Sequence, residues 1–142
     1  MDRRRMLAAF AAAAAALAMF PAARAHDHPA AGAATGALAD TAADCVKTGE
    51  ACAAHCIRML AAGDREMAEC LSRARQTVAI CAALVELASL ESPHLRKAAA
   101  AALDICRACE DECRRFESKH PVCKACADAC AACAEQCRPL AA

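Results

Sequence analysis

Apolar and polar residues follow a helical period in four consecutive segments of this chain. Apolar residues recur three or four positions apart, and charged residues fill the positions between them. The four segments span about residues 40–62, 64–90, 93–119 and 121–137. Because their connections are only a few residues long, neighbouring helices should run antiparallel. The pattern therefore predicts an all-α fold, an antiparallel up-down-up-down four-helix bundle over residues 40–138.

Residues with known positional preferences stand at the expected helix ends. Gly63 suits the position just past the end of the first helix. Asp64 and Ser92 are typical N-cap residues for the second and third helices. Pro139 is expected to stop the fourth helix, since proline lacks a backbone N–H.

Residues 1–25 have the pattern of an export signal peptide. Three arginines at positions 3–5 precede an apolar run, and Ala23-Arg24-Ala25 fits a small-x-small cleavage site. The paired arginines and the following Met6-Leu7 favour the twin-arginine route, with general secretion as the alternative. The run of about 13 residues is shorter than the ~20 that span a bilayer, so no membrane anchor is expected. We expect a periplasmic protein with a flexible lead-in over residues 26–39.

Large apolar side chains are too few for an ordinary bundle core. After residues 1–25, the remaining 117 residues contain 19 Leu, Val, Ile, Met and Phe in total. A bundle usually places about three positions in seven at its core, and alanine is too small to fill them alone. The same 117 residues have 13 basic and 16 acidic side chains, a net charge of −3, which gives no broad basic surface for nucleic acid.

The 13 cysteines account for the missing core positions. They are Cys45, Cys52 and Cys56 on the first helix, Cys70 and Cys81 on the second, Cys106, Cys109 and Cys113 on the third, and Cys123, Cys126, Cys130, Cys133 and Cys137 on the fourth. Residues three, four, seven or eleven positions apart share one helix face. We therefore expect all the thiols to line the interior of the bundle.

Three explanations could account for an interior lined with cysteines. Cysteine packs well as a small apolar residue, but unprotected thiols would be oxidised in an export compartment. Disulfides cannot pair an odd number of cysteines, and Cβ atoms four residues apart on a helix are ~6 Å from each other, against the ~3.8 Å that a disulfide needs. Soft-metal binding by thiolates is therefore the favoured explanation.

The spacing of the cysteines also bears on which metal is bound. Structural zinc usually takes four ligands at knuckle spacings, and bacterial iron–sulfur sites use a different cysteine pattern. Cu(I) accepts two or three thiolates, which suits the C-x3-C pairs Cys52/Cys56, Cys109/Cys113, Cys126/Cys130 and Cys133/Cys137. Neutralising buried thiolates favours a capacity near one Cu(I) per cysteine. A zinc or mixed-metal buffer and a thiol or iron–sulfur redox protein remain alternatives, and no catalytic constellation indicates an enzyme.

An exported, alanine-rich four-helix bundle lined with C-x3-C cysteines resembles the bacterial copper storage protein family. The resemblance covers about Asp40 to Cys137. It implies high-capacity Cu(I) storage with multiple ions per chain, all 13 cysteines as ligands and a homotetramer. The stored copper would supply a copper enzyme or simply be kept from doing damage. The resemblance also implies an entrance built from His, Met or both.

An antiparallel bundle brings four candidate entrance residues to one end. Met59, Met67 and His55 are the predicted entrance ligands, because thioether and imidazole bind Cu(I) more weakly than thiolate does. Core packing is the alternative for the two methionines, and His120 is a further candidate. His26-Asp27-His28 would begin the cleaved protein and is a candidate auxiliary copper site.

Overall fold

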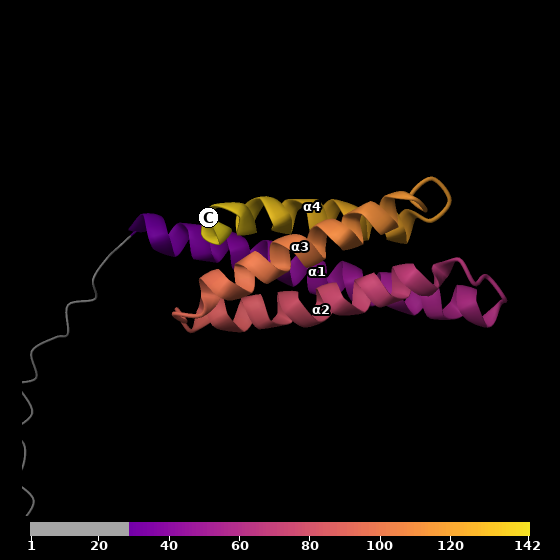
Figure 1. Ribbon diagram of the computed structural model, residues 1–142, viewed down its shortest axis with the longest axis horizontal. Coiled ribbons are helices and arrows are strands. Elements are labelled where there is room, and N and C mark those ends of the chain that lie inside the picture. Colours follow the sequence, from indigo (N-terminus) through magenta and orange to yellow (C-terminus); the bar gives the residue numbers. More distant parts are fainter. Residues whose placement is uncertain (1–28) are drawn as a thin grey trace, which may run out of the picture.

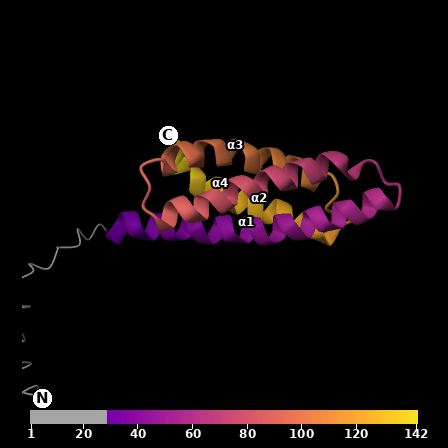
Figure 2. The same cartoon turned by 90° about the horizontal axis from the view of Figure 1, so that it is seen from below.

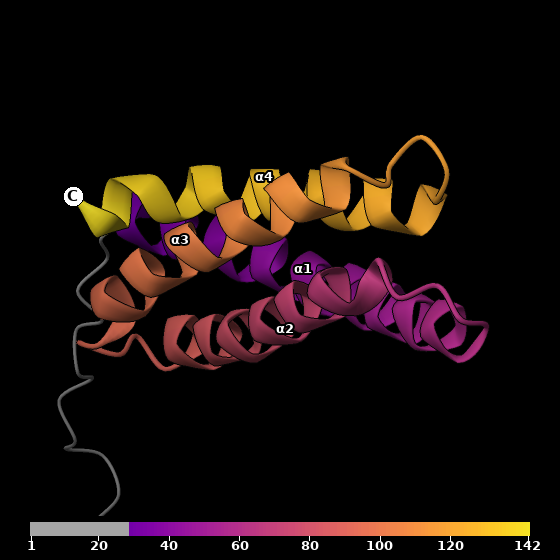
Figure 3. The ribbon, with the colours of Figure 1, turned by 45° about the vertical axis from the view of Figure 1, so that its right-hand side comes forward.

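The computed structural model describes residues 29–142, which form four α-helices with no strand among them (Figure 1). The helices are α1 (Pro29–Ala61), α2 (Met67–Ser89), α3 (Leu95–Arg114) and α4 (Pro121–Ala141). Around the bundle, α1 packs against α2 and α4, and α3 packs against the same two helices. The α1–α2 and α3–α4 connections lie at one end, and the α2–α3 connection and the C-terminus lie at the other (Figures 2 and 3). The predicted antiparallel four-helix bundle is confirmed.

Two helices end in the same hydrogen-bonded turn. After α1, the Asp64 N–H donates to the Met59 carbonyl and the Gly63 N–H to the Leu60 carbonyl, both at 3.0 Å. Gly63 has a φ of +97°, which a residue with a Cβ rarely adopts, so its predicted position just past the helix is confirmed. After α2, Glu91 takes the equivalent left-handed position with a φ of +48°.

The N-terminal boundaries of three helices differ from those predicted. The lead-in over 26–39 was expected to be flexible, yet α1 begins at Pro29. The alanines of residues 29–39 favour helix, and the fully buried Leu38 packs this part of α1 into the core. Asp64 does not cap α2, because its carboxylate accepts from the Glu66 N–H (3.1 Å) in the preceding turn. Ser92 likewise accepts from the His94 N–H (3.2 Å), and α3 starts only at Leu95.

The C-terminal boundaries of α3 and α4 differ as well. α3 ends at Arg114, and turns that include the buried Phe116 replace its predicted last residues up to 119. The expected stop at Pro139 is wrong, since α4 continues to Ala141. A proline in the last turn removes only the hydrogen bond to the carbonyl four residues earlier, so the helix tolerates it there.

The interior of the bundle has two parts. All 13 cysteine side chains are fully buried and occupy most of its length. Toward the α2–α3 connection, the buried core residues are Leu38, Leu84 and Leu95 together with alanines. At the opposite end of the bundle, the core includes the buried Met67.

Within residues 29–142, no helix is long and apolar enough to cross a membrane. The export signal predicted over 1–25 and the candidate site His26-Asp27-His28 lie outside the described residues and stay predictions.

Candidate metal centre

Thiols from four helices meet inside the bundle as free cysteines. None of the 13 takes part in a disulfide, and neighbouring Sγ atoms lie 3.7–4.0 Å apart in several contacts between helices. A disulfide would bring two Sγ atoms to ~2.05 Å. The sequence prediction that every cysteine faces the interior is therefore confirmed.

Three of these sulfurs form a nearly regular triangle. Cys52 of α1, Cys70 of α2 and Cys113 of α3 are separated by 3.7, 3.7 and 4.0 Å. The point equidistant from three sulfurs with these separations lies about 2.2 Å from each of them. Metal–thiolate bonds are ~2.3 Å long in zinc sites. A three-coordinate ion would therefore fit between the three sulfurs with little movement of the helices.

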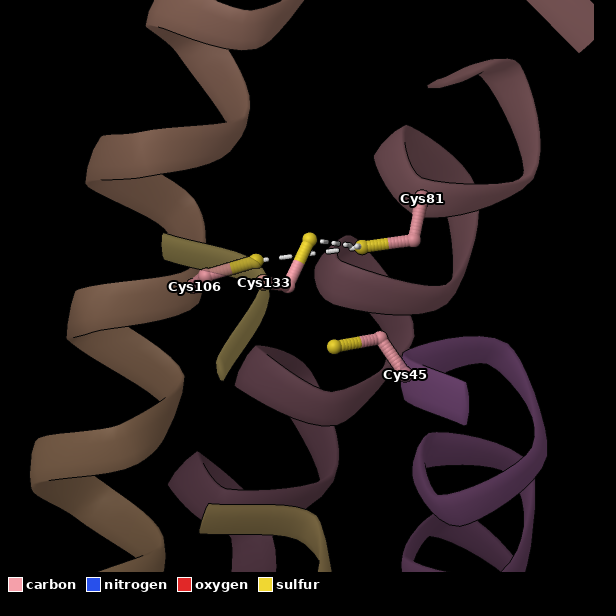
Figure 4. A group of neighbouring side chains, drawn as sticks. All are labelled: Cys45, Cys81, Cys106 and Cys133. Carbon is pink, nitrogen blue, oxygen red and sulfur yellow. Dashed lines mark hydrogen bonds between the residues drawn. The ribbon is translucent and has the colours of Figure 1, made fainter. Parts of the chain in front are cut away.

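A second group takes one cysteine from each helix (Figure 4). The sulfurs of Cys45, Cys81, Cys106 and Cys133 all lie within 4.8 Å of one another. Cys81 is 3.7 Å from Cys106 and 4.0 Å from Cys133. The Cys45 thiol donates instead to the backbone carbonyl of Ala129 at 3.1 Å. Four converging thiols are also what a tetrahedral ion requires.

Shared cysteines join further groups into a continuous lining. Three additional sets have ligand atoms within 4.8 Å of one another: Cys52/Cys113/Cys126, Cys52/Cys56/Cys70 and Cys109/Cys126/Cys130. Cys52 and Cys126 each belong to two of these sets, so ions in adjacent sites would share ligands. The C-x3-C pairs Cys52/Cys56 and Cys126/Cys130 fall within single sets. The Sγ atoms of a third pair, Cys109 and Cys113, lie 4.0 Å apart.

Two cysteines extend the lining beyond these groups. Cys123 and Cys137 belong to none of the groups, although both are fully buried. Cys123 interacts with Cys52 and Cys70, and Cys137 interacts with Cys133. The structure thus brings eleven predicted ligands into sets of three or four and leaves these two beside them.

Hydrogen bonds among the thiols lower the pKa of some cysteines and raise the pKa of others. Interaction with Cys130 is the largest effect on Cys106 and lowers the pKa of its thiol to about 5. The same contact raises the pKa of Cys130, because that thiol is held as the donor. Cys133 and Cys137 form a similar pair, in which Cys133 raises the pKa of Cys137. Since the thiolate is the metal-ligating form, the lining already favours negative charge at some positions, which a soft cation would neutralise.

Comparison with known protein families agrees with the thiol-lined geometry of the core. The model of the copper storage protein family (Csp) matches residues 31–142 of the chain. The chain belongs to the copper storage protein family.

Two solved structures and one further bacterial protein are similar over most of the chain. The solved structure of Cu(I)-bound copper storage protein BsCsp3 is 33% identical, covers 77% of this chain and 99% of its own, and gives a TM-score of 0.68. Apo-Csp3 from Bacillus subtilis is 35% identical with a TM-score of 0.66, covering 76% of this chain and 99% of its own. The uncharacterized cysteine-rich protein YhjQ of Bacillus subtilis strain 168 is 35% identical over 99 residues, which is 70% of this chain and 88% of the relative.

In this member of the family, the end with the α1–α2 and α3–α4 connections carries the predicted entrance residues. Met67 is fully buried, and Met59 packs partly buried against the core. The rings of His55 and His120 have their centroids 4.7 Å apart, so the structure brings these two together. The His55 Nε2 is buried and has no hydrogen-bond partner. Burial, then the charges of His120 and Arg58, lower the pKa of His55, which keeps its imidazole neutral and able to act as a ligand.

Sequence reasoning missed one polar residue of the core. Thr77 of α2 is fully buried among the cysteines. A signal was available, because Thr77 is seven residues after Cys70 and four before Cys81 and therefore shares their helix face. A lone threonine on a helix does not by itself indicate metal chemistry, whereas a run of cysteines does.

Proposed function

We propose that this protein stores Cu(I), holding many ions per chain between the thiolates that line its core. The observation that carries the proposal is the triangle of Cys52, Cys70 and Cys113, whose dimensions fit a three-coordinate thiolate site. Overlapping sets that share Cys52 and Cys126 extend this coordination along the bundle. Membership in the copper storage family supports the same function, and storage requires no catalytic step.

Zinc is the second candidate because one group suits it. Cys45, Cys81, Cys106 and Cys133 supply the four thiolates of a tetrahedral zinc site. The three-sulfur sets do not offer that coordination without sharing ligands. Zinc at four thiolates per ion would saturate near three ions on 13 cysteines, whereas neutralisation by Cu(I) favours a number close to 13.

Anaerobic titration of the reduced protein with Cu(I), against a colorimetric Cu(I) chelator, tests the proposal. We expect no transfer of copper to the chelator until about ten or more ions are bound, since each thiolate can be neutralised by one ion. Saturation at one or two ions would contradict storage. A parallel zinc titration that ends near three ions, with weaker retention against a zinc chelator, would agree with copper as the stored ion.

We further propose that copper enters at the end of the bundle that carries His55, Met59 and Met67. Support comes from the buried, unpartnered Nε2 of His55 and from the contact between His55 and His120. Imidazole and thioether groups would pass the ion to the thiolates of Cys56 and Cys123 deeper in the core. Replacing both histidines, as in His55→Gln with His120→Gln, should slow loading in stopped-flow measurements and leave the final capacity unchanged. An unchanged rate would place the entrance elsewhere.

The proposed location is the periplasm, reached by the twin-arginine route. The support is the arginine pair at positions 3 and 4 and the apolar run that follows it. Cell fractionation should find the wild-type chain in the periplasm, and Arg3→Lys with Arg4→Lys should retain it in the cytoplasm. Processing that is unchanged in this variant would favour general secretion.

A homotetramer and delivery of copper to a copper enzyme complete the proposal. The homotetramer rests on the resemblance to copper storage proteins, and delivery is one of two uses of a copper store, the other being protection from free copper. Light scattering coupled to size-exclusion chromatography measures the molar mass in solution. A mass equal to that of one chain would contradict the tetramer. Transfer of copper to an added apo-enzyme in the same compartment would support the delivery role.

A further inference from the structure

One set of converging thiols takes a ligand from every helix of the bundle. Its members are Cys45 of α1, Cys81 of α2, Cys106 of α3 and Cys133 of α4. All four side chains are fully buried, and their sulfurs converge between the helices (Figure 4). The other sets within residues 29–142 have three cysteines each. This set alone among them could surround an ion with four thiolates.

The separations of the four sulfurs fit a tetrahedral ion. With metal–sulfur bonds of ~2.3 Å, neighbouring sulfurs of a regular tetrahedron lie about 3.8 Å apart. Cys81 is 3.7 Å from Cys106 and 4.0 Å from Cys133. The remaining pairs lie within 4.8 Å, so movements of about 1 Å or less complete the coordination. The Cys45 thiol would exchange its weak hydrogen bond to the Ala129 carbonyl (3.1 Å) for a metal bond.

Four thiolates in a tetrahedron suit a different metal from two or three. Tetrahedral sites of four sulfurs typically hold zinc or iron–sulfur clusters, and zinc sites closed by four protein ligands are structural. Bacterial iron–sulfur sites draw most of their cysteines from one short run of sequence, whereas each cysteine of this set comes from a different helix. Zinc is therefore the ion that the set fits best.

We propose that the copper-free protein binds one structural Zn(II) ion at Cys45, Cys81, Cys106 and Cys133, and that copper displaces this ion. The role differs from zinc storage, because a single ion joins the four helices and is held more tightly than any later one. The unfolded chain does not bring these cysteines together, so the binding free energy adds to the stability of the bundle. Displacement, unlike the zinc site itself, rests on the proposed function.

Charge explains why copper would replace zinc. One Zn(II) ion on four thiolates leaves two negative charges in the core, and burying uncompensated charge is costly. One Cu(I) ion per thiolate leaves none. Thiolates are also soft ligands, which favour Cu(I). Copper loading should therefore expel the zinc.

Cobalt reports the coordination directly, because tetrahedral Co(II) with four thiolates has a characteristic visible spectrum. One equivalent of Co(II), added anaerobically to the reduced, copper-free protein, should give this spectrum, and one equivalent of Zn(II) should abolish it. Free zinc at about 100 times its Kd should raise the melting temperature by about 10 °C. Full loading with Cu(I) should then release the zinc to a zinc-specific dye.

Cys45→Ala removes the ligand from α1 and should weaken binding of the first zinc ion by at least ~100-fold, since even partners of the ligands contribute ~10–100-fold. Cys106→Ser, which keeps the size of the side chain, should have the same effect, and circular dichroism shows whether each variant is folded. Cys123→Ala is the matched control, because Cys123 is equally buried but belongs to none of the sets. It should leave this zinc affinity unchanged.

The proposal is overturned if folded Cys45→Ala and Cys106→Ser bind the first zinc ion as tightly as the wild-type protein, or if Cys123→Ala weakens it equally. A cobalt spectrum with fewer than four sulfurs, or zinc that stays bound in the fully copper-loaded protein, would also overturn it. Failure of the proposed function looks different, because the wild-type protein would then hold only one or two Cu(I) ions, whatever its affinity for zinc.

Discussion

The Sγ atoms of Cys70 and Cys113 lie 3.7 Å apart, although 43 residues separate them along the chain. One comes from α2 and the other from α3, and Cys52 of α1 completes the triangle. Because each helix is held by its neighbours, the sulfurs keep this spacing before any ion arrives. The bundle thus preorganises its thiols for soft-metal binding, so little energy is lost to rearrangement on loading.

Cys113 should matter more to copper capacity than a cysteine at the end of the lining. Its sulfur lies within 4.0 Å of those of Cys52, Cys70 and Cys109. Cys113→Ala should lower the capacity by about two ions, since soft-metal sites that share a thiolate are lost together. Cys137→Ala is the matched control, because Cys137 belongs to no set of converging thiols, and it should lower the capacity by at most about one ion. Equal losses in titrations of the two variants would argue against shared ligands.

Copper loading should release a number of protons that depends on pH. The pKa of Cys106 is about 5, so near pH 7 this residue is already a thiolate and releases no proton when it binds copper. Below pH 5 the Cys106 thiol is protonated, so an ion that binds to its sulfur must displace that proton. The apparent affinity for Cu(I) therefore falls at low pH. Calorimetry in buffers of different ionisation enthalpy should find more protons released per ion at pH 4.5 than at pH 7. The same count at both values would contradict this prediction.

The copper-free protein should lose stability in mildly acidic solution through His55. Burial, together with the charges of His120 and Arg58, lowers its pKa below the usual histidine value of about 6.5, so the unfolded chain binds the proton more tightly. The stability that the folded protein gains from a neutral His55 is fully present above pH 6.5 and is lost as the pH falls below that value. Melting temperatures between pH 7.5 and 5.5 should fall less for His55→Gln than for the wild-type chain. His94→Gln, at an exposed position, should fall as the wild type does.

Gly49 allows α1 and α2 to approach each other beside the thiols. A Cβ at this position would lie 2.7 Å from Cγ2 of Val78, which is too close for a relaxed contact. Gly49→Ala should therefore lower the free energy of unfolding by about 1 kcal/mol, since overpacking of ~1–3 kcal/mol outweighs the gain of ~1 kcal/mol in helix propensity.

A double-mutant cycle in urea separates the overpacking from the helix propensity. Val78→Ala should cost less stability in the Gly49→Ala background than in the wild type, because it removes the atom that clashes. Strictly additive changes in the free energy of unfolding would show that the side chains at positions 49 and 78 are not in contact.

The sequence predicted which face of each helix carries thiols, but not which thiols meet across helices. A helical period decides the face, so the burial of all 13 cysteines follows from their spacing. Partnerships such as Cys70 with Cys113 depend on how far one helix slides along another, which packing at places like Gly49 and Val78 determines. The start of α1 at Pro29 was missed because Gly32 and Gly36 indicate a flexible segment, while the burial of Leu38 overrides that local preference.

Copper-edge anomalous diffraction from crystals of the loaded protein tests the central claim most directly. The account predicts many copper peaks along the interior of the bundle, each about 2.3 Å from two or three sulfurs, with one between Cys52, Cys70 and Cys113. A single peak within the group Cys45, Cys81, Cys106 and Cys133, or peaks confined to the exterior of the helices, would contradict it.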